Sequence, residues 1–140
     1  MIEKIEWQGK ILALIVRYGF DNQGVNFVTD ENSPLQVGVL RHPQGFRIKP
    51  HIHTASKKII TTVQEVLHVE YGRVGVNFYD GNGEQIGSAV LNMGDTILLI
   101  AGGHGFDILE DSKIIEVKQG PYEGVERDKK LLGNSQVVDK

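Results

Sequence analysis

Glycines recur through the chain at intervals of about one β-strand, and this spacing is the strongest constraint on the fold. The sequence has 140 residues and 17 glycines, and the segments between them favour Val, Ile, Thr and aromatic residues, which suit strands. The stretch DGNGE at Asp80–Glu84 predicts a hairpin, because Asn and Gly tolerate the positive φ of tight turns. We therefore expect an all-β protein.

The pattern predicts many short strands in a single domain, as in a sandwich or a barrel. We divide the chain into an N-terminal strand and loop extension (1–34), a barrel (35–122) and a charged C-terminal tail (123–140). The expected strands are Ile11–Tyr18, Leu35–Leu40, Phe46–His53, Ile59–Tyr71, Arg73–Tyr79, Gln85–Leu91, Thr96–Ile100, Gly105–Leu109 and Lys113–Gln119.

Composition narrows the possible partners and chemistry. A net charge of -3 offers no basic excess for phosphate backbones, so we expect no nucleic-acid partner. The chain has no cysteine, so a metal would need imidazole and carboxylate ligands. The apolar run ILALIV is too short to cross a membrane and lacks signal-peptide flanks, so we expect a cytoplasmic protein without a membrane partner.

A glutamate interrupts the apolar face of the expected strand Ile59–Tyr71. Side chains alternate between the two faces of a strand, so Glu65 shares a face with Val63, Leu67 and Val69. A carboxylate on a core face costs several kcal/mol or more unless a cation, a proton or hydrogen bonds compensate it. Glu65 therefore needs a partner.

Two histidines on the preceding strand are candidates for that role. His51 and His53 stand two positions apart, so their Cα atoms would be about 6.5–7 Å apart on one face of a strand. Both rings could then bind one ion, and two imidazoles with one carboxylate form a known metal-binding triad. A surface His-x-His pair and a Lys49–Glu65 salt bridge are the alternatives.

The segment from Gly45 to Gly72 resembles the first signature of the cupin superfamily. GFRIKPHIH fits its glycine and His-x-His, and EVLHVEYG supplies Glu65 and the closing Gly72. The gap between His53 and Glu65 is longer than in the family, and an inserted loop, TASKKII, would restore the register. GDTILLIAGGHGFDI resembles the second signature, with Ile100 in place of proline and His104 one residue early.

This resemblance implies a double-stranded β-helix, or jelly-roll barrel, with a metal site inside its mouth. The implied ligands are His51, His53, Glu65 and His104, and the ion would be a divalent transition metal: Fe, Mn, Ni, Zn, Co or Cu. QEVLHVEYGRVGVNFYD, LLIAGGHGF and EVKQGPY also resemble small single-domain cupins associated with bacterial polysaccharide and nucleotide-sugar gene sets. That association identifies no reaction.

Four polar residues are candidates for substrate binding beside the site. Arg47 and Lys49 fall on the histidine face and would hold a carboxylate or phosphate. Glu116 and Lys118 share a face of a later strand and form either a polar pair at the barrel mouth or an exposed salt bridge. No catalytic residue is assigned.

Three functions remain open for such a chain. The first is a metal-dependent enzyme of the isomerase, epimerase or oxygenase type that acts on a small polar molecule such as a sugar derivative. The others are a non-catalytic ligand-binding module and a structural or interaction protein without metal. We expect a homodimer, because edge strands invite pairing, with KILALIVRYG as the exchanged or interface strand.

Overall fold

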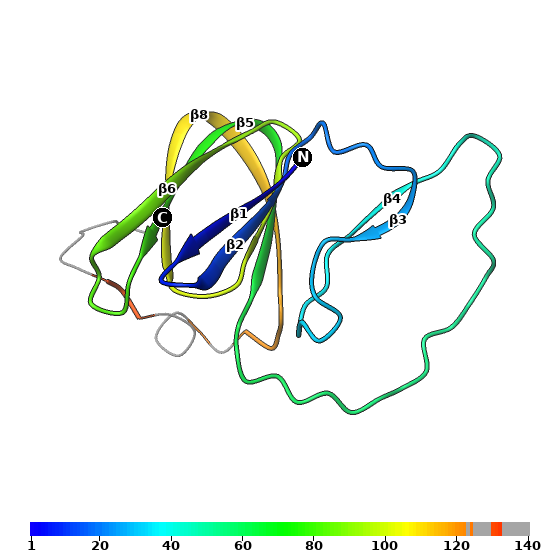
Figure 1. Cartoon of the computed structure of the whole chain (residues 1–140), viewed down its shortest axis with the longest axis horizontal. Helices are drawn as coiled ribbons and strands as arrows, with labels where there is room; N and C mark the ends of the chain where they lie inside the picture. The colour runs from blue at the N-terminus through cyan, green and yellow to red at the C-terminus, as the bar shows by residue number, and fades with distance from the viewer. Residues whose placement is uncertain (123, 125–129, 133–140) are drawn as a thin grey trace.

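The computed structural model describes residues 1–122, 124 and 130–132, and this part of the chain is all-β without a helix. Figure 1 shows a strongly curled sheet on one side and a hairpin with a long connecting segment on the other. The strands are β1 (Ile2–Trp7), β2 (Lys10–Val16), β3 (Gly24–Phe27), β4 (Gly38–Arg41), β5 (Glu65–Tyr79), β6 (Gln85–Asn92), β7 (Thr96–Leu99) and β8 (Gly103–Lys118).

Six antiparallel strands form the curled sheet, which has the shape of half a barrel. The order β1, β2, β7 leads to β5, whose first part pairs with β7 and whose second part pairs with β6. β8 runs along the opposite edge of β5, from the pair Glu65 and Lys118 to the pair Tyr79 and Gly103. The expected all-β class is confirmed.

The concave face of the sheet carries the hydrophobic core. On β5, Leu67 and Val69 are buried, as the expected alternation with Glu65 predicted. Further along β5, Val74, Val76 and Phe78 point into the same core. β2 and β7 supply most of its remaining side chains: Leu12, Ala13, Ile15, Ile97 and Leu99.

A distortion at Gly72 marks the place where β5 and β8 bend. The pairing register between the strands shifts around Tyr71 and Arg73, as at a β-bulge. Gly72 has a φ of +90°, and a Cβ there would lie 2.1 Å from Ser112 Oγ. The Arg73 backbone N–H donates to the same Ser112 hydroxyl at 3.0 Å. Gly72 therefore permits a crossing that other residues would obstruct.

A buried aspartate ties the end of β2 to the turn between β6 and β7. Asp95, 3% exposed, accepts hydrogen bonds from the backbone N–H groups of Tyr18 and Asn92 and from the Arg17 guanidinium at 2.8–3.0 Å. Burial opposes ionisation, but these donors outweigh it and hold the pKa of Asp95 below its ordinary value. Arg17 also binds Glu3 of β1.

β3 and β4 form a separate two-stranded hairpin. Residues 42–64, which we call the arm, follow it and contain neither helix nor strand. In Figure 1 the hairpin and arm extend away from the curled sheet before the chain returns to β5. The hairpin is held to the preceding loop by an ion pair between Arg41 and Asp21.

The arm contradicts two of the expected strands. Phe46–His53 is not a strand, and Ile59–Tyr71 begins only at Glu65. Their composition suits strands, but a strand also needs a neighbour to satisfy its backbone hydrogen bonds. Within the described residues the arm has no paired neighbour.

Several other boundaries differ from the expectation. The strand expected at Leu35–Leu40 is shifted to β4, and the pattern predicted neither β1 nor β3. Two expected strands, Gly105–Leu109 and Lys113–Gln119, form the single long strand β8. The first 34 residues contribute β1 and β2 to the main sheet, with β2 between β1 and β7. Most of the tail 123–140 lies outside the described residues.

Candidate functional site

Strand pairing places several of the predicted site residues on the concave face. Residues directly opposite each other in an antiparallel pair point to the same side of the sheet. His104 lies opposite the buried Phe78, and Glu116 lies opposite the buried Leu67. Lys118 lies opposite Glu65.

Glu65 and His104 meet although they are 39 residues apart in the chain. His104 Nε2 lies 3.1 Å from Glu65 Oε2, and the side chains are 29% and 14% exposed. β5 and β8 pair antiparallel over their whole length, but Glu65 and His104 are near opposite ends of that ladder, so the curl of the sheet brings them together. The inward carboxylate predicted from the alternation thus has an imidazole partner.

A second polar contact adjoins this pair. Lys118 Nζ lies 3.9 Å from Glu65 Oε1 and 3.8 Å from Glu116 Oε1. It also lies 5.4 Å from the centre of the Tyr122 ring, within range of a cation–π interaction. The predicted residues Glu116 and Lys118 therefore adjoin Glu65 and form a partly exposed polar group with it on the concave face.

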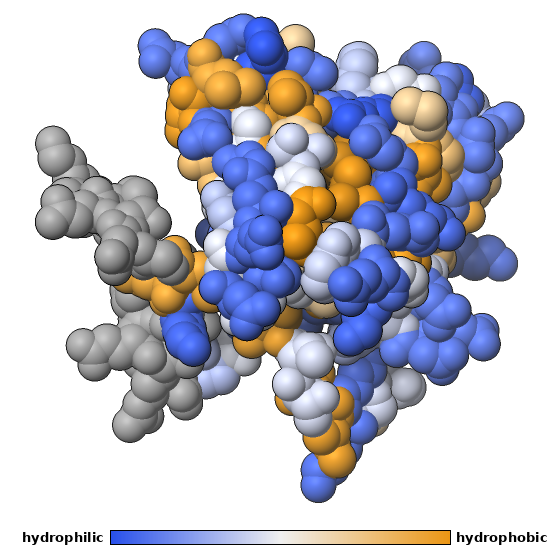
Figure 2. Space-filling model, turned by 60° about the vertical axis from the view of Figure 1, so that its left-hand side comes forward, coloured by the Kyte–Doolittle hydropathy of each residue, from blue (hydrophilic) through white to orange (hydrophobic). Residues whose placement is uncertain are grey.

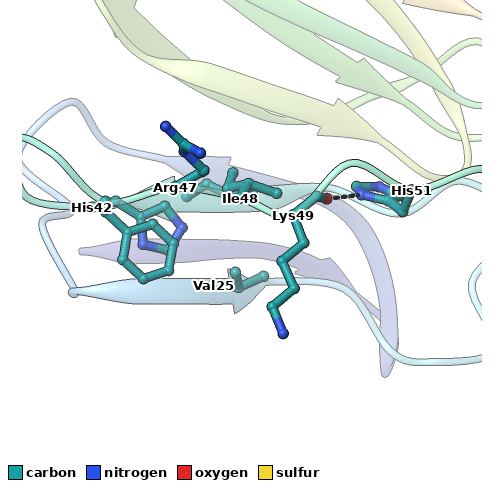
Figure 3. A pocket seen from close by; sticks show the side chains of 8 residues that line it. Val25, His42, Arg47, Ile48, Lys49 and His51 are labelled. Atoms are coloured by element: carbon teal, nitrogen blue, oxygen red, sulfur yellow. Dashed lines mark hydrogen bonds between the residues drawn. The ribbon is translucent and has the colours of Figure 1, made fainter.

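The other two predicted ligands lie on the arm. The rings of His51 and His53 are 5.3 Å apart between centroids in an edge-to-face arrangement, and both residues are exposed. His51 Nδ1 is 2.9 Å from the carbonyl oxygen of Lys49 (Figure 3). The four predicted ligands thus form two pairs, one on the sheet and one on the arm.

Across the part of the chain that the structure describes, no three His, Asp or Glu side chains are grouped closely enough to hold a metal ion. Glu65 and His104 supply two suitable donors, and His51 and His53 supply two more. The set of four remains a prediction whose completion requires the arm to approach the sheet.

The start of the arm and the hairpin line an open apolar hollow of about 460 Å³. Figure 3 shows Val25 on β3 facing His42 and Ile48 of the arm, with Arg47 and Lys49 pointing in different directions. His42 stacks on Phe46 with ring centroids 4.1 Å apart. The full lining is Val25, Leu40, His42, Phe46, Arg47, Ile48, Lys49 and His51.

The sequence analysis missed a pair of glutamines beside the Glu65 site. The Gln64 backbone N–H donates to Gln119 Oε1 at 2.9 Å. Gln64 is only 5% exposed, and among the described residues its Oε1 and Gln119 Nε2 are buried without a hydrogen-bond partner. One acceptor and one donor are therefore available to a water or a polar ligand. In the sequence only Gln64 adjoins Glu65, so the meeting of Gln64 with Gln119 depends on the alignment of β5 with β8.

Comparisons with known proteins add no family assignment. No family model, curated protein or solved structure matches the chain. Among the described residues, no helix is long and apolar enough to span a membrane.

Proposed function

We infer that the protein is a metal-binding cupin with a jelly-roll barrel, and that its ion is held by His51, His53, Glu65 and His104. Its activity is that of a metal-dependent enzyme of the isomerase, epimerase or oxygenase type. The substrate class is a small polar molecule such as a sugar derivative.

The contact between Glu65 and His104 carries this proposal. These two residues come from separate sequence signatures, and their side chains meet at 3.1 Å on the concave face of a curled antiparallel sheet. A glutamate on a core face needs a cation or a hydrogen-bond donor to be stable. A metal ion bound by the same carboxylate and imidazole would fulfil that need.

The donor set suits a divalent transition metal. Three imidazoles and one carboxylate bind Fe, Mn, Co, Ni, Cu or Zn, and four protein ligands leave room for a substrate on an octahedral ion. When bound, such an ion supplies Lewis-acid polarisation of a carbonyl or hydroxyl, or oxygen activation.

The protein's own residues would bind and orient the substrate around this site. Lys118 presents an ammonium group beside Glu65 and would hold a substrate carboxylate or phosphate. Glu116, half exposed beside Lys118, can accept hydrogen bonds from sugar hydroxyl groups. Arg47 and Lys49 would add positive charge if the arm lay over this site.

Metal content by mass spectrometry tests the proposal on protein purified without a histidine tag or chelator. We expect near-stoichiometric metal in the wild type and at least a tenfold loss in His104→Ala and Glu65→Gln. The matched control is His68→Ala, because His68 is a histidine of β5 that bonds Thr96 Oγ1 at 3.0 Å instead of Glu65. Turnover abolished by chelation and restored by one metal would establish the enzyme.

An ion-pair network without metal is the competing function, and the contact of Lys118 with Glu65 favours it. In that case the native protein would be metal-free and would take up none of the six metals. A non-catalytic receptor would instead show a ligand that raises the melting temperature by mass action without being consumed.

A further inference from the structure

The arm exposes an unusual number of apolar side chains for a connecting segment. Ile52 is 89% exposed, and the other exposed apolar residues of the arm are Phe46, Ile48, Ile59, Ile60 and Val63. Long segments without secondary structure are uncommon inside compact domains and are usually functional or disordered. Their composition is also usually polar. An apolar arm therefore implies a surface that covers it.

A second uncovered surface lies on β8. This strand of 16 residues pairs with β5 along one edge, and no other described strand pairs with it. Its exposed apolar side chains are Phe106, Ile108, Leu109, Ile115 and Val117. Figure 2 shows that apolar side chains lie between hydrophilic ones on one face of the molecule. A long unpaired edge of this kind is a template for an added strand.

The charges of the two surfaces are opposite in sign. The arm carries Arg47, Lys49, Lys57 and Lys58 and no acidic residue. β8 carries two lysines and four acidic residues, which are Asp107, Glu110, Asp111 and Glu116. A basic apolar arm and an acidic apolar edge are complementary, and such complementarity fixes the partner and the register.

Within one copy the two surfaces stay apart. The arm begins by packing on its own hairpin, where Phe46 and Ile48 line the hollow with Val25 and Leu40, and it then extends away from the curled sheet (Figure 1). Each copy therefore presents one arm and one free edge. Two copies related by a two-fold axis would satisfy both arms and both edges in a closed dimer.

We propose that the arm of one copy adds as a strand to the free edge of β8 in a second copy. The segment Phe46–His53 then has the neighbour that its strand-like composition lacks in the single chain. This docking places His51 and His53 of one copy beside Glu65 and His104 of the other. That last step rests on the proposed metal function, whereas the docking itself does not.

Cysteine cross-linking tests the docking independently of any metal, since the natural chain contains no cysteine. The double variant Ile52→Cys/Leu109→Cys puts both thiols on the outer face of the extended sheet when His51 and His53 face His104. It is treated with a short bismaleimide at micromolar protein. We expect covalent dimers, and light scattering of the untreated wild type should give twice the 15.5 kDa chain mass. The matched control Ile52→Cys/Val90→Cys keeps the arm thiol and moves the other to exposed Val90 of β6, so cross-linking should fall at least tenfold.

Three results would overturn the docking. A link formed within one chain would mean that the arm covers its own sheet. A monomer at every concentration would exclude a second copy. A dimer whose cross-linking equals that of the Val90 control would mean that copies associate through another surface.

Mixed dimers test the shared site. His51→Ala/His53→Ala protein and His104→Ala protein are unfolded together and refolded with metal. If each arm docks on the other copy, the intact arm of the His104→Ala copy meets the intact sheet of the His51→Ala/His53→Ala copy. One of the two sites in each mixed dimer then has all four natural ligands, so the mixture regains metal that neither variant binds alone. Cross-linked dimers without recovered metal would refute the shared site and leave the docking intact. If the wild type also binds no metal, the proposed function itself fails.

Discussion

The curled sheet and the arm have similar strand-forming composition but reach different states in one chain. On the sheet, every strand pairs with at least one neighbour and the apolar face is buried. On the arm, residues such as Ile52 and Ile59 are as apolar but exposed. Strand formation therefore depends here on access to a pairing edge more than on local composition.

Replacing a phenylalanine of the core and one of the arm should give the largest difference in the free energy of unfolding. Phe78 is 1% exposed and Phe46 is 57% exposed. We expect Phe78→Ala to lower the free energy of unfolding by about 3–5 kcal/mol, because it removes a buried ring and leaves a cavity. Phe46→Ala should cost less than about 1 kcal/mol in dilute protein. Urea denaturation measures both, and equal losses would mean that the arm is buried in solution.

Replacement of Gly72 tests the bend of the sheet. Its positive φ and the proximity of Ser112 Oγ and the Asp111 carbonyl should make Gly72→Ala less stable by about 2–4 kcal/mol. The control is Gly81→Ala in the hairpin turn, where an added Cβ meets nothing within 4 Å and a change below about 1 kcal/mol is expected. Comparable melting temperatures for the two variants would show that a side chain at position 72 does not strain the bend.

The hydrogen bonds of Asp95 predict that the stability of the curled sheet depends on pH. Because the pKa of Asp95 is lower in the folded protein, its stabilising effect is fully present above its unfolded pKa of about 3.9. That effect is lost as the pH falls through the lower folded pKa. At pH 7, Asp95→Asn should cost about 1–3 kcal/mol, and the loss should shrink in acid.

The control for this experiment is Asp30→Asn, which replaces an exposed turn residue before the arm. Denaturation curves from pH 7 to pH 3 should show a change below about 0.5 kcal/mol for the control throughout. A pH-independent loss in Asp95→Asn would assign the effect to packing instead of charge.

Replacing the two arm histidines should have the smallest effect on the stability of the metal-free protein. Both are exposed, so His51→Ala/His53→Ala should change the unfolding free energy of metal-stripped protein by less than about 0.5 kcal/mol. With metal added, the wild type should gain stability by mass action and the variant should not. Thermal melts with and without Zn²⁺ measure this, and an equal gain in the variant would remove both histidines from the site.

The sequence predicted the local features of the sheet well. The alternation around Glu65 placed Leu67 and Val69 in the core, and the turn at Asp80–Glu84 forms, with Asp80 accepting the backbone N–H groups of Asn82 and Glu84. The alternation of a strand also applies to His104, Phe106 and Ile108, which pair opposite the buried Phe78, Val76 and Val74. These features depend on the period of the strand and on turn chemistry, which are readable from a single sequence.

What the sequence could not provide was the set of strand neighbours. Phe46–His53 alternates as a strand should, yet whether it pairs depends on residues far along the chain. The long strand β8 was divided at the polar run around Asp111, because pairing with β5 across a bulge leaves no local signature. The buried amides of Gln64 and Gln119 were missed for the same reason, since they meet only when β5 and β8 align.

The central position of β5 has a consequence for synthesis of the chain. β5 is flanked by β6 and β7 on one edge and by β8 on the other. Because Gly103 pairs with Tyr79 and Lys118 pairs with Glu65, the Glu65 end of the second edge is the last to be covered during synthesis. Until then the growing chain exposes a long apolar strand that could pair with a neighbouring nascent chain. Slow elongation through the codons of β8 would therefore favour aggregation, whereas rapid completion of that strand would favour the curled sheet.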